Sequence, residues 1–156
     1  MILEQLKVRV KGKVVKAFKK AAKEAFPKET LAYMLGTIRG KNLTIESLYF
    51  PPDVDEHCTA KAVFVQKSWV KAAKKEAKTM GLEVVGDIHS HPYEWSALKS
   101  IKTGCPLPDA APSESDWDSE SVGLVGICLV KEQKGGKKIA RVKFFAPMLP
   151  QVAVIE

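Results

Sequence analysis

The sequence predicts a single α/β domain in which helices pack on a central, largely antiparallel sheet. Three observations support this fold class. Short β-like segments alternate with two amphipathic helical segments, turn residues separate them, and no repeat or domain boundary interrupts residues 1–156. A chain of 156 residues can bury a core without disulfide or metal staples. We therefore expect one compact domain.

Two segments carry apolar residues at helical spacing. In residues 13–26 the apolar face comprises Val14, Val15, Phe18, Ala21, Ala22 and Ala25, and lysines occupy the opposite face. Pro27 should end this helix. In residues 66–80 the expected inner face comprises Trp69, Ala73, Ala77 and Met80. Gly81 follows as a suitable C-terminal cap.

The remaining regular segments are expected to be strands. They are residues 6–10, 30–37, 43–50, 82–89, 122–131 and 138–147, with a last short strand at 152–155. Residues 30–37 and 43–50 flank a polar turn and predict a hairpin, and a second turn is expected at Gly135-Gly136. The segment 82–89 is rich in apolar residues and should be a well-buried strand.

The formal net charge is +7, and most of the basic residues are lysines. We interpret them as solvated helix faces rather than a nucleic-acid surface, because no stretch interleaves arginine with aromatic residues as single-strand binders do. No apolar run approaches the length of a transmembrane helix, and residues 1–10 lack an apolar signal region. We expect a cytoplasmic protein without a membrane partner.

The three cysteines are widely spaced and form no Cys-x-x-Cys pair, which argues against a structural zinc knuckle. Cys128 lies in an apolar run and is expected to be a buried small hydrophobe. Cys58 and Cys105 lie in loop-like segments. They could pair, but an intracellular setting favours free thiols.

The strongest chemical signal is His89-Ser90-His91-Pro92, at the end of the predicted buried strand. Alternate residues of a strand project to one face, so both imidazoles can reach a single metal while Ser90 points away. Pro92 lacks an N–H and should end the sheet pairing, leaving the histidines at the strand's edge. Imidazole nitrogen suits zinc. The alternative interpretation is a pair of polar residues at a strand end.

Two further segments offer carboxylates. Ser113 and Asp116 form a Ser-x-x-Asp pattern that can supply a metal ligand and a hydroxyl, and that also resembles a helix capping box. Glu29 precedes an apolar run and could face a metal site from the mouth of a buried strand. Its alternative is a solvated connector between a helix and a strand.

Together these segments resemble the JAMM (MPN+) metalloprotease family. Its pattern is an upstream glutamate in a Pro-x-Glu segment, as at Pro27 and Glu29, followed by His-Ser/Thr-His-Pro and then Ser-x-x-Asp. The order of elements also matches, so the resemblance covers nearly the whole chain. It implies one MPN-type domain over residues 1–156.

The resemblance implies a role for each matching residue. His89, His91 and Asp116 become the ligands of one catalytic zinc ion, with water in the fourth position. Glu29 becomes the general base for the attacking water and later the acid for the leaving amine. Ser113 becomes a hydrogen-bond donor to the oxyanion.

Two features depart from the family pattern. The family has about seven residues between the second histidine and the serine, whereas residues 93–112 intervene here. We expect this long loop to overhang the site and restrict which polypeptides enter. In addition, Ser115 and Asp118 also fit Ser-x-x-Asp. We prefer Ser113 and Asp116 because the family commonly has proline before the serine.

The resemblance implies an isopeptidase that acts on a ubiquitin-like modifier, either on its conjugates or at its C-terminus. A second hypothesis keeps the same fold and proposes an enzyme that acts on a peptide end of a sulfur-carrier protein. Two other classes stay open: a non-catalytic MPN-type scaffold, and a RadC-type protein associated with nucleic acid. A zinc deaminase is disfavoured because the chain has no Pro-Cys-x-x-Cys segment.

Overall fold

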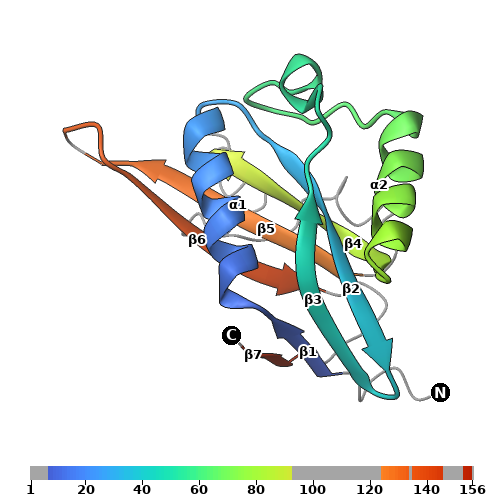
Figure 1. The fold of residues 1–156 in the computed structure, drawn as a ribbon. Coiled ribbons are helices and arrows are strands. Elements are labelled where there is room, and N and C mark those ends of the chain that lie inside the picture. Colours follow the sequence, from blue (N-terminus) through green and yellow to red (C-terminus); the bar gives the residue numbers. More distant parts are fainter. Residues whose placement is uncertain (1–6, 93–123, 134, 146–152, 156) are drawn as a thin grey trace.

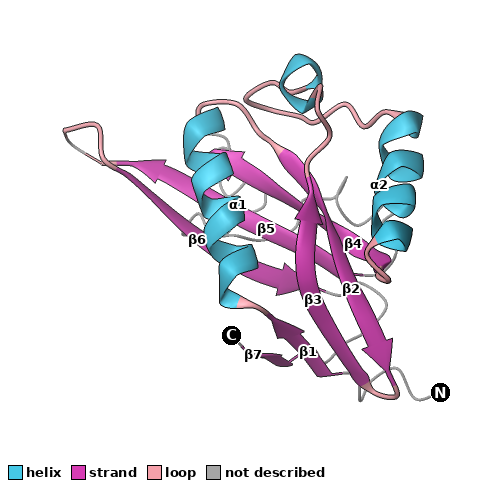
Figure 2. Cartoon of the chain, in the orientation of Figure 1, coloured by secondary structure: helices cyan, strands magenta, loops and turns pink. Residues whose placement is uncertain are grey.

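The computed structural model describes residues 7–92, 124–133, 135–145 and 153–155. In chain order its elements are β1 (Lys7–Val10), α1 (Gly12–Ala25), β2 (Leu31–Arg39), β3 (Asn42–Tyr49), a 3-10 helix (Val54–His57), α2 (Lys67–Thr79), β4 (Glu83–Pro92), β5 (Leu124–Glu132), β6 (Lys138–Phe145) and β7 (Ala153–Ile155). Figures 1 and 2 show the two long helices lying against the sheet. Every predicted strand and both predicted helices are present, within a few residues of their expected bounds.

The seven strands of the described residues form one sheet in the order β6-β5-β4-β2-β3-β1-β7. Three of their pairings are antiparallel, namely β2–β3, β2–β4 and β5–β6. The other three are parallel: β1–β3, β1–β7 and β4–β5. The prediction of a mixed sheet covered by helices is confirmed, although antiparallel pairs make up half of the sheet rather than most of it. β4 lies between two neighbours, so the strand that carries the histidines is internal.

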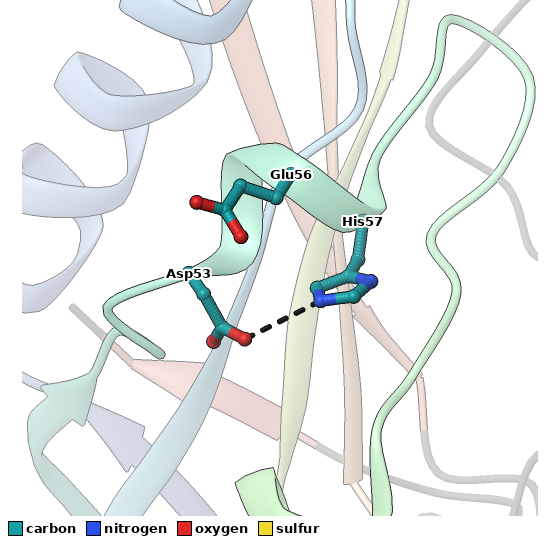
Figure 3. Close-up of side chains that lie close together, drawn as sticks. All are labelled: Asp53, Glu56 and His57. Atoms are coloured by element: carbon teal, nitrogen blue, oxygen red, sulfur yellow. Dashed lines mark ion pairs between the residues drawn. The ribbon is translucent and has the colours of Figure 1, made fainter.

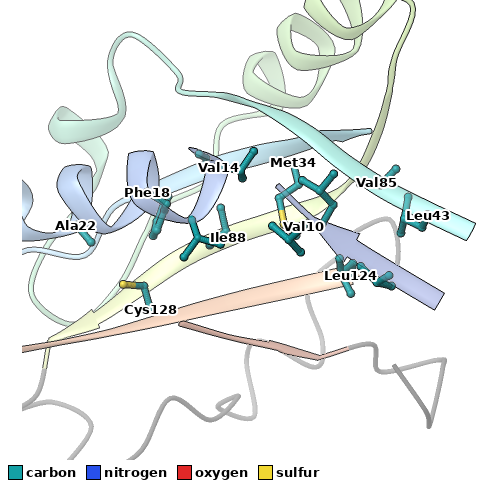
Figure 4. Packing of buried hydrophobic residues seen from close by; sticks show 14 of the residues in the cluster. Val10, Val14, Phe18, Ala22, Met34, Leu43, Val85, Ile88, Leu124 and Cys128 are labelled. Atoms are coloured by element: carbon teal, nitrogen blue, oxygen red, sulfur yellow. The ribbon is translucent and has the colours of Figure 1, made fainter. Parts of the chain in front are cut away.

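The two helices cover opposite faces of the sheet. Alternate residues of β2 belong to different clusters: Met34 packs in the core beneath α1, whereas Tyr33 packs with Trp69 of α2. In Figure 4, Phe18 of α1 lies over Ile88 of β4. The predicted inner face of α1 is confirmed at its centre, where the buried residues are Val14, Val15, Phe18 and Ala22. The faces of the sheet are therefore chemically distinct.

Two local expectations need correction. Met80 is 47% exposed rather than inward-facing, because α2 ends at Thr79 and the chain turns at Gly81, whose φ is +70°. The loop-like segment expected around Cys58 is preceded by the 3-10 helix Val54–His57. A single short turn of this kind leaves little periodic signal in a sequence. None of the helices in the described residues is long and apolar enough to cross a membrane.

Candidate metal centre

The two histidines of β4 point to the same face of the sheet, the face that α2 covers. His89 pairs in register with Leu31 of β2 and with Ile127 of β5, so it lies between two apolar neighbours. The exposed fraction is 7% for His89 and 1% for His91. β4 does end at Pro92, but pairing continues to that residue. The expectation that Pro92 leaves the histidines at an open edge is therefore wrong, because β5 pairs with every residue of β4 from Gly86 to Pro92.

The ring nitrogens converge as a metal site requires. Nε2 of His89 lies 3.2 Å from Nε2 of His91. Two imidazole nitrogens bound to one tetrahedral zinc ion, each at about 2.0–2.1 Å, lie about 3.3 Å apart. The separation of the two nitrogens therefore matches that of two imidazole ligands on one zinc ion. The ring centroids are 5.0 Å apart and tilted by 56°, so the rings meet at their nitrogen edges rather than stacking.

Ser90, between the histidines, points to the opposite face and joins β4 to the start of β2. Its N–H donates to the carbonyl oxygen of Thr30 at 3.0 Å, and its Oγ accepts from the N–H of Thr30 at 2.8 Å. These two bonds extend the β2–β4 pairing by one residue beyond Leu31 and His89. The prediction that Ser90 turns away from the histidines is confirmed.

Glu29 lies two residues before β2, beside the end of β4 that carries the histidines. When the antiparallel register of Leu31 with His89 is extended by two residues, Glu29 falls opposite His91 on the same face. Glu29 is 4% exposed, so it is not a solvated connector. Its backbone N–H donates to the carbonyl oxygen of Thr59 at 2.8 Å, which ties it to the loop after the 3-10 helix. Residues far apart in the chain therefore share one face of the sheet.

Several predicted site residues lie outside the described residues. They are Ser113, Asp116, the alternative pair Ser115 and Asp118, Cys105, and the loop at 93–112. The third ligand and the oxyanion donor therefore remain predictions from the sequence.

Two titratable side chains near the site, Tyr33 and Cys58, are buried. Burial, with a smaller contribution from the charge of Asp87, raises the pKa of Tyr33 to about 12. Burial also raises the pKa of the Cys58 thiol to about 11, and the nearby charges of Asp55 and Glu29 add to that rise. Cys58 is buried and free. A thiol that stays protonated at neutral pH is not an activated nucleophile. Cys58 is therefore not activated as a nucleophile in this setting.

A second group of metal-ligand residue types was missed in the sequence. Within the described residues, Asp53, Glu56 and His57 place one ligand atom each within 4.8 Å of one another (Figure 3). Their i, i+3, i+4 spacing is the signal in the sequence that could have indicated this group. Oδ2 of Asp53 lies 3.3 Å from Nε2 of His57, and Oδ1 accepts from Nε1 of Trp69 at 2.8 Å. Asp53 therefore already has a structural role, because it joins His57 of the 3-10 helix to Trp69 of α2.

The sequence model of the family described as "Prokaryotic homologs of the JAB domain" matches residues 11–96, more than half of the chain. The chain belongs to the prokaryotic JAB family. The match includes Glu29, His89 and His91 of this JAB domain, and it ends before Ser113 and Asp116. No curated protein matches the chain.

Solved structures agree with this assignment at the level of the fold. A JAB1/MPN domain protein from Archaeoglobus fulgidus is 20% identical, with 97% of this chain and 100% of that chain covered and a TM-score of 0.50. A protein from Desulfitobacterium hafniense is 15% identical, with coverage of 96% and 93% and a TM-score of 0.60. A Salinibacter ruber protein is 18% identical, with coverage of 88% and 87% and a TM-score of 0.50. The MPN-type fold predicted for this JAB domain is confirmed.

Proposed function

We propose that this JAB domain is a zinc-dependent metalloprotease that hydrolyses an amide or isopeptide bond at the C-terminus of a ubiquitin-like modifier. The observation that carries the proposal is the 3.2 Å separation of the two Nε2 atoms of His89 and His91 in a buried setting. At this separation both nitrogens can bind one metal ion, and imidazole nitrogen is a common zinc ligand. A shared zinc ion would use both nitrogens as ligands.

The ligand set is completed from the sequence. Asp116 would supply the third protein ligand, with one position left open, as in other catalytic zinc sites. Zinc bound there would act as a Lewis acid toward water and toward the carbonyl of the scissile bond. The proposed substrate class is the one implied by the resemblance to the JAMM (MPN+) family, and membership of the JAB family is consistent with it.

Glu29 and Ser113 would perform the remaining chemistry. Glu29 accepts a proton from the attacking water, whose oxygen adds to the carbonyl carbon, and then gives the proton to the amine nitrogen as the C–N bond breaks. Its position opposite His91 in the extended register supports this role. Ser113 would donate a hydrogen bond to the carbonyl oxygen as that oxygen gains negative charge.

The test is a cleavage assay on conjugates of several ubiquitin-like proteins and on a short isopeptide, with zinc content measured on the same preparations. Glu29→Gln keeps the side-chain shape and removes the basicity. We expect normal zinc content and turnover reduced by about a hundredfold or more. Glu24→Gln, an exposed position on α1, is the matched control and should behave as wild type. A zinc-loaded wild-type protein that cleaves none of these substrates would support a non-catalytic scaffold instead.

A second experiment determines the third ligand. Asp116→Asn should weaken zinc binding strongly, whereas Asp118→Asn should not. The reverse pattern in a zinc titration would move the Ser-x-x-Asp segment by two residues, to Ser115 and Asp118.

A further inference from the structure

Asp87 lies on the same strand and the same face as the two histidines. It precedes His89 by two residues, so the alternation of β4 places its side chain next to that imidazole. Oδ1 of Asp87 lies 3.4 Å from Nδ1 of His89, and the exposed fractions of the two side chains are 13% and 9%. Neither the family pattern used above nor the predicted ligand set gives Asp87 a role.

The two nitrogens of His89 therefore face different groups. Nε2 faces His91 and Nδ1 faces Asp87. A metal ligand must present an unprotonated nitrogen, so a neutral ring bound through Nε2 carries its proton on Nδ1. A carboxylate beside Nδ1 accepts that proton's hydrogen bond and disfavours the other tautomer. The 3.4 Å contact is somewhat longer than a good N–H···O bond of about 2.7–3.2 Å, and a small ring rotation closes it.

The neighbours of Asp87 strengthen this contact. Tyr33 of β2 and Val125 of β5 pair with Asp87 in register, and both are buried. The Tyr33 hydroxyl makes no hydrogen bond with any of the described residues, so it does not compete with His89 for the Asp87 carboxylate. With little water nearby, a charge-assisted contact between carboxylate and imidazole is stronger than it would be at the surface.

We propose that Asp87 is a positioning residue that accepts the Nδ1 hydrogen of His89, fixes its tautomer and aims Nε2 at the zinc. The inference rests on the proposed function, because it needs zinc to bind at His89 and His91. Carboxylates that orient zinc-bound histidines in this way contribute about ten- to a hundredfold to metal affinity.

The experiment is a zinc-affinity measurement by competition with a chromogenic chelator. Asp87→Ala should bind zinc about ten- to a hundredfold more weakly than wild type. Asp87→Asn should lie between them, because its amide oxygen still accepts a hydrogen bond but carries no charge. Glu83→Gln, an exposed carboxylate on the same strand, is the matched control and should leave the affinity unchanged.

A second measurement separates positioning from a general loss of stability. In zinc-loaded wild-type protein, nitrogen-detected NMR of the His89 ring should show the proton on Nδ1, and Asp87→Ala should broaden or lose that signal. Zinc binding in wild type with equal affinity in Asp87→Ala would overturn the inference and leave the proposed function intact. Failure of wild type to bind zinc would overturn both.

Discussion

Ser90→Ala tests how the strand pairing holds Glu29 at the histidines. The substitution removes the Oγ that accepts from the N–H of Thr30 at 2.8 Å. Thr30 is only 3% exposed, so water cannot replace the lost partner. Leaving one buried donor unsatisfied costs about 1–3 kcal/mol. For a chain of this size that corresponds to a fall in Tm of roughly 2–12 °C.

The effect on function should be selective. Ser90 faces away from the metal, so zinc stoichiometry should not change. Glu29 adjoins Thr30, so loosening the pairing should misplace the carboxylate and lower turnover by about ten- to a hundredfold, the scale expected for a shift near 1 Å. Differential scanning fluorimetry, zinc analysis and the isopeptide assay measure the three quantities, with the exposed Ser68→Ala on α2 as control. Unchanged Tm and turnover, or loss of zinc, would refute this reasoning.

Two further predictions follow from close packing and burial. Gly86→Ala would place a Cβ in collision with the carbonyl oxygen of Leu124 and force β4 and β5 apart, so we expect a loss of about 1–3 kcal/mol in urea unfolding. Gly12→Ala, with open space around it, is the control and should be near neutral. Burial and the charge of Asp55 raise the Cys58 pKa from 9.0 to about 11, so its contribution to stability should be present below pH 9 and lost as the pH rises toward 11. Unfolding measured between pH 8 and 11 on wild type and Cys58→Ala checks this; an equal pH slope in both would contradict it.

The sequence predicted the fold well because its signals are local. The apolar face of α1, the hairpin turn and the cap at Gly81 each depend on neighbouring residues, and the structure has all of them. The alternation of His89 and His91 likewise follows from strand geometry alone. What the sequence could not give was burial of the histidines, because that depends on β5 pairing alongside β4.

Contacts between distant segments were harder to foresee. The placement of Glu29 opposite His91 follows from extending the register of β2 with β4, and nothing in either segment alone specifies that register. Asp87 belongs to none of the motifs identified in the sequence, and its contact with His89 is known only from the structure. The residues proposed to carry the chemistry could therefore be identified in the sequence, but those proposed to position them could not.

The most direct test of the central claim is the zinc content per chain of three histidine variants, measured by mass spectrometry after circular dichroism has shown that each is folded. The structure offers two sets of candidate ligands, the pair on β4 and the trio that includes His57. We predict that His89→Ala and His91→Ala each lose most of the bound zinc, because two remaining protein ligands rarely hold a catalytic ion. His57→Ala should keep a full equivalent. Full zinc content in both β4 variants, or its loss in His57→Ala alone, would contradict the assignment of the metal centre to β4.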